Sequence, residues 1–444
     1  MKIADLLLSE KNRITTFKQL ILKSITICYF IFIISVTLMG RSNLWQNQTI
    51  MPLFYSYKDA WNNFSVTSWK NIVLNFLLFV PLGILIPMVT TKCKTFWKTV
   101  LTAILLSTSI ETIQLLTGLG IFELDDILGN TIGTMIGYGI YELSDFLFAL
   151  KRESSFRSKS IVRIILLQLP LCLTIAVFSF IFIFYNMQEL GQLKNQYITP
   201  FQNINVSSNI KYNDISHNLP VYRIQKKLTK KDTAIFAKTF FENIGTTIDK
   251  NRNDFYEDTA VYYSADNHSL WIDYMGGNYK FFDYDTIYPD GPTHPIIDAE
   301  EKLIRKTLKD YGIDVPIGAN FNITKNGEYE FNSNKLFENG VLYDGTITCE
   351  YNSNGCFSKI NNNILVLAPY KDYEVISEKA AYETLCTGEF YYPINTEENH
   401  IDIVVDQCDI EYIVDTKGYY QPVYSFSSKI NGNPYKIQIP ALKN

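Results

Sequence analysis

The stretch that decides the fold runs from Ser107 to Leu143 and reads STSIETIQLLTGLGIFELDDILGNTIGTMIGYGIYEL. It contains two strongly apolar segments, each long enough to cross a bilayer. Glu111, Gln114, Asp126 and Asn130 nevertheless lie within these segments or at their ends. An ionised group at mid-bilayer depth costs at least about 2.5–3.5 kcal/mol, so a chain that keeps one usually has a use for it. These residues therefore form the candidate functional site.

Composition divides the chain in two. Almost all long apolar runs lie before Tyr185, and the remainder of the 444 residues is polar and rich in Tyr, Asn and Asp. We therefore predict a transmembrane domain over residues 1–189 and a soluble region after it. The net charge of -5 is small for this length and excludes nucleic acid as a partner. All four histidines follow Tyr185, so the membrane part cannot build a histidine-ligated metal site, and we predict no bound metal.

The apolar runs predict an α-helical bundle of about five transmembrane spans. Their expected bounds are residues 21–39, 71–91, 99–119, 127–150 and 164–185. Lys and Arg are concentrated before the first span, between the second and third, and between the fourth and fifth. By the positive-inside rule the N-terminus is cytoplasmic, and five crossings leave the rest of the chain outside the cell. The localisation predicted is therefore a multi-pass cell membrane protein with an extracellular C-terminal domain.

The region after Met187 alternates helix and strand patterns, which predicts an α+β fold. Thr229 with Asp232 begins a helix through a capping-box pattern, and Ser377 begins another. Turn residues near Pro289–Pro292 suggest a division into two modules, residues 190–292 and 293–444. Four cysteines lie here, and their spacing predicts disulfides between Cys349 and Cys356 and between Cys386 and Cys408, with reduced buried thiols as the alternative.

The polar residues of three spans are expected at similar depths in the bilayer. If the third span enters from the cytoplasm and rises about 1.5 Å per residue, Glu111 lies about two-thirds of the way across, with Gln114 on the same face. Asp126 and Asn130 occupy the outer end of the fourth span, and Asn75 the outer part of the second. Five polar side chains therefore converge on the outer-leaflet half, and with Asp125 they form the candidate ligand-binding set.

Each of these residues also has a structural alternative. Asp125 or Asp126 can cap the fourth helix. Asn75, Gln114 and Asn130 can form hydrogen bonds between helices. Helix capping does not require a carboxylate at Glu111, which favours a ligand, cation or proton role there. Gly129, Gly133 and Gly137 recur every four residues, which lets a neighbouring helix approach closely and suggests a contact with a membrane-protein partner.

Four motifs in order resemble the VanZ-like family of bacterial membrane proteins. They are M-P-L-F from Met51 to Phe54, N-F-L-L-F-V-P-L-G from Asn75 to Gly83, E-x-x-Q from Glu111 to Gln114, and F-E-L-D-D-I-L-G-N-T-I-G from Phe122 to Gly133. Many members carry an Arg shortly before the Asp-Asp pair, where this chain has Gly120. The resemblance implies lowered sensitivity to glycopeptide antibiotics such as teicoplanin. The ending D-T-K-G-Y-Y-Q-P-V-Y, Asp415 to Tyr424, resembles PepSY and YycI-like extracytoplasmic modules.

Three function hypotheses follow from this pattern. The first is a non-enzymatic envelope protein that binds an amphiphile, with membrane lipids, a lipid-linked envelope precursor or a glycopeptide antibiotic as partner. The second is a membrane enzyme that acts on a lipid-linked precursor, with Glu111 as acid or base and Asp126 positioning a cation or amine. The third is an envelope sensor that signals through its spans. The sequence contains no phosphate-binding glycine loop, no G-x-S-x-G and no H-E-x-x-H, so we predict no cofactor and favour the first hypothesis.

Overall fold

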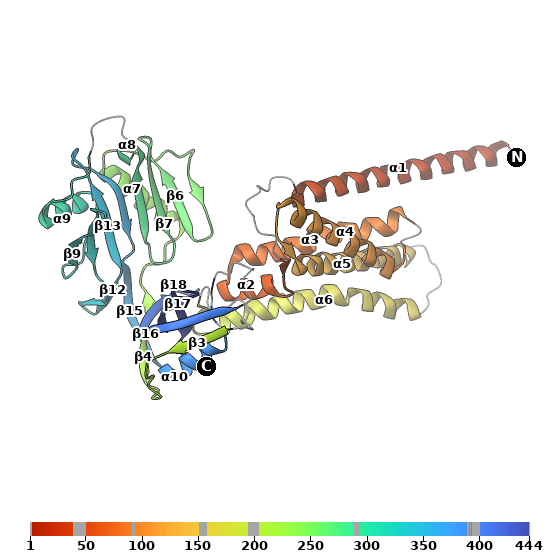
Figure 1. The fold of residues 1–444 in the computed structure, drawn as a ribbon. Helices are drawn as coiled ribbons and strands as arrows, with labels where there is room; N and C mark the ends of the chain where they lie inside the picture. Colours follow the sequence, from red (N-terminus) through yellow and green to blue (C-terminus); the bar gives the residue numbers. More distant parts are fainter. Residues whose placement is uncertain are drawn as a thin grey trace. The chain divides into compact units, whose positions relative to one another are not determined.

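The computed structural model describes residues 2–38, 50–90, 94–150, 158–193, 204–287, 294–388, 390, 392 and 400–443. The chain forms two compact units (Figure 1). The first is helical and extends to Glu189, where the sequence predicts the end of the transmembrane domain. The second begins at Leu190 and is rich in β-strands.

Six helices build the first unit among the residues that the structure describes. They are α1 (Lys2–Leu38), α2 (Tyr55–Asn63), α3 (Val66–Val89), α4 (Phe96–Thr117), α5 (Leu124–Leu150) and α6 (Ser158–Met187). Local sequence sets several ends: the Ser65 hydroxyl accepts a hydrogen bond from the Ser68 amide where α3 begins, and Gly118 ends α4 with φ of 68°. Buried side chains of α1, α3 and α4 form a shared core that includes Ile33, Phe79 and Ala103.

Four helical segments among the described residues are long and apolar enough to cross a membrane. They are Gln19–Leu38, Val66–Val89, Phe96–Thr117 and Ile161–Met187. They match the predicted spans at residues 21–39, 71–91, 99–119 and 164–185, so a bundle of apolar membrane helices is confirmed. The segment predicted at 127–150 is also helical, but α5 is not among these four. Its acidic residues and glycines lower its apolar character.

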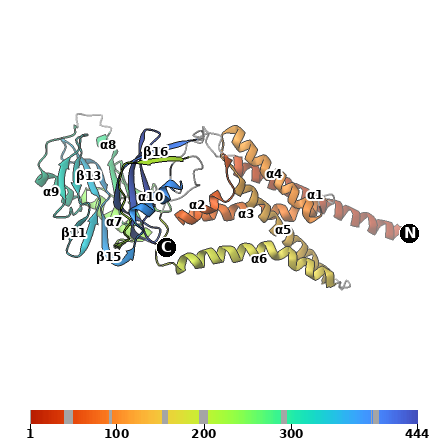
Figure 2. The same cartoon turned by 60° about the horizontal axis from the view of Figure 1, so that its bottom comes forward.

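Helix α3 lies beside α5 (Figure 1 and Figure 2), and Gly129, Gly133 and Gly137 of α5 face it. A Cβ atom built on Gly133 would lie 2.0 Å from the Phe76 carbonyl oxygen, and one on Gly137 would lie 2.0 Å from the Val80 carbonyl oxygen. Close approach of the two backbones therefore requires glycine at these positions. The proposed partner contact through Gly129, Gly133 and Gly137 is thereby corrected, because a helix of the same chain occupies this face.

The first sheet of the second unit is antiparallel throughout. Its strand order is β5-β6-β7-β8-β14-β13-β10-β9. The bounds are β5 (Asp254–Phe255), β6 (Thr259–Tyr263), β7 (His268–Asp273), β8 (Tyr279–Asp283), β9 (Asn320–Ile323), β10 (Tyr329–Asn332), β13 (Thr346–Tyr351) and β14 (Phe357–Asn362). Helices α7 (Lys230–Asn243) and α9 (Glu301–Asp310) bury Phe241 and Leu308 against it, and the short α8 (Tyr284–Ile287) follows β8. Thr229 and Asp232 form the predicted capping box of α7.

The second sheet has the order β11-β12-β15-β4-β17-β16-β3, and β18 also pairs with β17. The bounds are β3 (Ile204–Ser208), β4 (Asn218–Ile224), β11 (Leu336–Glu338), β12 (Val341–Asp344), β15 (Leu365–Glu374), β16 (Ile401–Val414), β17 (Tyr419–Ile430) and β18 (Asn433–Pro440). Helix α10 (Glu378–Cys386) begins at Ser377, as predicted, and packs against it through Leu385.

The sheets correct the predicted division at residue 292. Strand β8 precedes this point and pairs with β14, which follows it, so a boundary there would cut the first sheet. Strand β4 likewise pairs with the distant β15 and β17 in the second sheet. Turn residues mark a loop, but they do not show which strands pair across it. Residues 190–292 and 293–444 are therefore not separate modules.

Both predicted disulfides are also corrected, because Cys349, Cys356, Cys386 and Cys408 are all free. Cys349 is paired across the sheet with Ile360 and lies in the core of the first sheet, where burial raises the pKa of its thiol. A register shift after Glu350 separates this strand position from the turn that holds Cys356.

Candidate functional site

The helical unit contains a cavity of about 770 Å3 with a polar side and an apolar side. The polar lining residues are Tyr55, Ser56, Asp59, Ser68, Asn71, Asn75, Glu123 and Asp126. The apolar or aromatic ones are Tyr29, Phe32, Val36, Ile72, Leu74, Leu77, Leu78 and Pro81. They come from α1, α2, α3, β2 (Phe122–Glu123) and the start of α5. The cavity therefore offers both kinds of surface that an amphiphile needs.

One face of α3 changes from polar to apolar along its length. Ser68, Asn71 and Asn75 are three or four residues apart, which places them on a common face. Leu78 continues the same face and also lines the cavity. The Leu78 carbonyl accepts a hydrogen bond of 2.5 Å from the Tyr29 hydroxyl, which ties α1 to this part of α3.

Glu123 reaches the cavity from a short parallel bridge between β1 (Ile50–Met51) and β2. Its backbone N–H donates to Glu111 Oε2 over 3.0 Å, and its own carboxylate accepts from the Ser56 hydroxyl over 2.8 Å. Glu111 itself is 3% exposed and is not among the lining residues. Its carboxylate thus positions Glu123, a role that the sequence did not indicate.

Asp125 is buried and does not line the cavity, but it holds the start of α2, which does. One carboxylate oxygen accepts from the Phe54 amide over 2.5 Å and the other accepts from the Ser56 amide over 2.8 Å. These are free donors at the N-terminus of α2, where an acidic side chain also favours the helix dipole. The sequence offered Asp125 or Asp126 as the cap of their own helix, whereas Asp125 accepts from the amides at the start of α2.

Asp126 and Asn75 meet at the cavity wall. The Asn75 side-chain amide donates to Asp126 Oδ1 over 2.5 Å, which joins α3 to α5. Nearby, burial and then the charges of Asp125 and Asp126 raise the pKa of Tyr57 to about 12. The convergence of the second and fourth predicted spans at this point is therefore observed in the structure.

Gln114 and Asn130 form contacts between helices instead of lining the cavity. Gln114 Nε2 donates to the Thr37 carbonyl over 2.9 Å, linking α4 to α1. Asn130 Nδ2 donates to the Ser107 hydroxyl over 2.8 Å, linking α5 to α4. Both side chains are buried, as expected for polar residues that hold membrane helices together.

The polar side of the cavity is acidic. Asp59, Glu123 and Asp126 line it, and no Lys, Arg or His is among its described lining residues. Two of these acids escaped sequence reasoning, because only the fold of α2 and the β1–β2 bridge brings Asp59 and Glu123 to the site. Within the described part of the chain, no cluster of three His, Cys, Asp or Glu side chains is suited to a metal ion. The formal negative charge of this wall favours a cationic group.

The four apolar helices of membrane-spanning length make this chain a membrane protein. Residues 20–147 match the family model described as VanZ/LLP1, so the helical unit contains a VanZ-like domain. This match covers every lining residue of the cavity.

Other comparisons add little to this assignment. One solved structure, an uncharacterized protein from Eubacterium rectale, is 12% identical with a TM-score of 0.28, over 55% of this chain and 92% of that chain. No curated protein matches the chain.

Asp125→Asn is expected to destabilise the helical unit without removing a cavity group. The amide nitrogen would face a backbone N–H that now donates to a carboxylate oxygen, and loss of such a charged hydrogen bond costs about 1.5–3 kcal/mol. Thermal unfolding of the purified full-length protein in detergent measures the effect. An unchanged unfolding temperature would show that the carboxylate does not hold α2.

Proposed function

We propose that the VanZ-like domain binds an amphiphilic molecule of the cell envelope in the cavity between α1, α2 and α3, and so lowers sensitivity to glycopeptide antibiotics such as teicoplanin. The observation that carries this proposal is the lining itself. Hydrogen bonds join its carboxylates to hydroxyls and an amide, and aromatic and aliphatic side chains from α1 and α3 complete the lining. A molecule with a polar head and an apolar tail satisfies both.

The proposal includes a membrane topology of five spans. The length of α5 and its glycine contact with α3 support its place as the fifth membrane helix, despite its lower hydropathy. With basic connections on the cytoplasmic side, the N-terminus is inside and the β-rich unit is outside the cell. The polar side of the cavity then belongs to the outer leaflet, where envelope precursors and antibiotics meet.

Reporter fusions test the topology. Alkaline phosphatase fused after Asn444 is expected to be active, because that enzyme requires export, whereas a fluorescent cytoplasmic reporter at the same point is expected to stay dark. The matched control places both reporters between α3 and α4, after Lys94, where the opposite pattern is expected. A dark phosphatase and a bright reporter at Asn444 would overturn the five-span arrangement.

A cavity-filling substitution tests ligand binding. Leu74 lines the cavity, so Leu74→Trp is expected to displace the bound amphiphile and to lower the teicoplanin concentration that cells survive. Leu105→Trp is the matched control, since Leu105 is similarly exposed on α4 and is not a lining residue. Native mass spectrometry of the purified proteins reads lipid occupancy. Equal occupancy and equal protection in both variants would contradict the proposal.

A further inference from the structure

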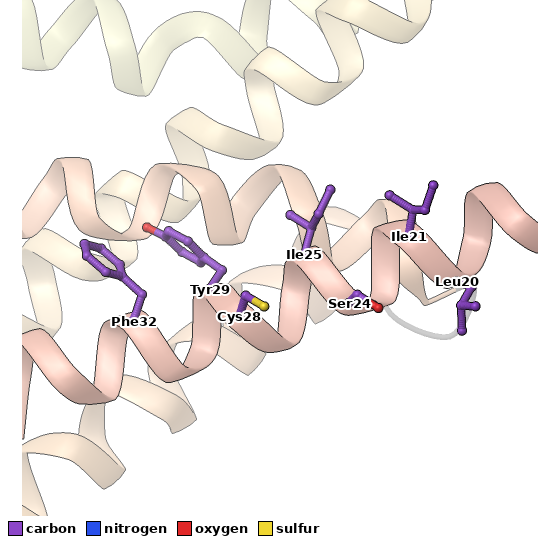
Figure 3. Close-up of a pocket in the computed structure, with 7 residues that line it drawn as sticks. All are labelled: Leu20, Ile21, Ser24, Ile25, Cys28, Tyr29 and Phe32. Atoms are coloured by element: carbon purple, nitrogen blue, oxygen red, sulfur yellow. The ribbon is translucent and has the colours of Figure 1, made fainter.

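A second, apolar groove lies on α1 and shares two lining residues with the cavity. It has a volume of about 510 Å3 and is lined by Leu20, Ile21, Ser24, Ile25, Cys28, Tyr29 and Phe32 (Figure 3). Tyr29 and Phe32 also line the acidic cavity. The two hollows are therefore neighbours on either side of these two aromatic residues.

The groove follows one face of α1. Its lining residues recur at intervals of three or four, which is the spacing of one helical face. From Leu20 to Phe32 this face rises about 18 Å, at about 1.5 Å per residue. The lining contains no charged side chain, and the Tyr29 hydroxyl is already hydrogen-bonded to the Leu78 carbonyl. The groove thus fits a hydrocarbon chain and offers little to a polar one.

The acidic cavity has the opposite character. Asp59, Glu123 and Asp126 carry formal negative charge, and all three accept hydrogen bonds from neutral side chains: Asn63 donates to Asp59, Ser56 to Glu123 and Asn75 to Asp126. A phosphate or carboxylate head group placed here would face like charges, whereas an ammonium group would find several acceptors. The negative charge of the cavity therefore favours a cationic head group, and the apolar groove favours a hydrocarbon tail.

We propose that the cavity and the groove form one binding site for an amphiphile with an ammonium head group, held near Asp126, and a long hydrocarbon tail that lies along α1 from Phe32 toward Leu20. This inference rests on the proposed function and specifies its ligand class.

Cys28 provides a reporter within the groove, because its thiol is exposed and lines the proposed path of the tail. Cys172 on α6 is also exposed and serves as an internal control in the same molecule. The full-length protein in phosphatidylcholine nanodiscs is treated with a membrane-permeant maleimide, and peptide mass spectrometry reads the modification of each cysteine. The probes are hexadecyltrimethylammonium, hexadecyl sulfate with the opposite head charge, and octyltrimethylammonium with a shorter tail.

Hexadecyltrimethylammonium is expected to slow modification of Cys28 and to leave Cys172 unchanged. Hexadecyl sulfate and octyltrimethylammonium are expected to protect Cys28 at least about tenfold less well at equal concentration, since each lacks one of the two matched features. Equal protection by the sulfate would overturn the ammonium assignment, and equal protection by the octyl probe would overturn the tail path.

Two variants extend the test to the chain itself. Asp126→Asn is expected to weaken protection by hexadecyltrimethylammonium about tenfold, because it removes a carboxylate charge from the head site. Asp145→Asn removes one exposed charge from the same helix away from the cavity and is expected to behave as wild type. Native mass spectrometry separates the two proposals: a bound envelope lipid without an ammonium preference would refute this inference and leave the proposed function standing.

Discussion

Gly133→Ala is expected to force α5 away from α3 and to cause a large loss of stability. The new Cβ would lie 2.0 Å from the Phe76 carbonyl oxygen and 2.9 Å from its carbon. Backbone atoms inside a helix cannot rotate aside, so the two helices must separate. Overpacking of this kind costs about 1–3 kcal/mol and sometimes more. Alanine regains at most about 1 kcal/mol through its higher helix propensity.

Gly129→Ala is the matched control on the same face. Its Cβ would lie 3.0 Å from the Phe76 ring, a side chain that can adjust. We expect the unfolding temperature of the full-length protein in detergent to fall for Gly133→Ala and to change little for Gly129→Ala. Equal unfolding temperatures would show that the two helices are less tightly packed than the glycine geometry requires.

The same glycines show how far sequence reasoning reaches for the fold. The spacing of glycines at every fourth residue correctly predicted a close contact with another helix. Such spacing places the glycines on one face of α5, where no side chain keeps a neighbouring backbone away. It could not identify the other helix, because many apolar helices fit a flat glycine face. Gly83 of α3 supplies the missing half: its Cβ would meet the Thr134 carbonyl oxygen of α5 at 2.2 Å. A contact between two glycine-containing helix faces can be identified only when the positions of both helices are known.

The β-rich unit illustrates a different limit. Helices beginning at Thr229 and Ser377 could be predicted because capping depends on residues three positions apart. The pairing of β8 with β14 joins residues far apart in sequence, and no turn signal encodes it. The pairing of Cys349 with Cys356 was wrong for a related reason, because the folded ladder places Cys349 opposite Ile360 and leaves Cys356 in the turn.

The site was predictable in part. Depth along the spans brought Asn75 and Asp126 together, and their side chains are hydrogen-bonded in the structure. Depth did not distinguish residues that face the cavity from residues that bind a neighbouring helix, as Gln114 and Asn130 do. Asp59 lies outside all five predicted spans, and only the placement of α2 against α3 brings it to the same wall.

Asp126→Asn is expected to abolish protection against a lipoglycopeptide while leaving the protein in the membrane. The substitution keeps the size of the side chain and an oxygen that accepts from the Asn75 amide, so the link between α3 and α5 survives. It removes one of the three carboxylates that line the cavity, and with it the charge that attracts a cationic group. We therefore expect Asp126→Asn to keep its fold and its membrane abundance and to lose protection.

Two controls make the Asp126→Asn result specific. Asp145→Asn removes an exposed charge from α5 outside the cavity and is expected to retain protection. Glu111→Gln keeps an oxygen that can accept from the Glu123 amide, so we expect it to lose less protection than Asp126→Asn. Growth at increasing teicoplanin concentration measures protection, and quantitative blotting of membranes measures abundance. Full protection by Asp126→Asn at normal abundance would show that the acidic lining residues do not bind the ligand. A greater loss of protection in Glu111→Gln would show that the essential carboxylate is the buried Glu111.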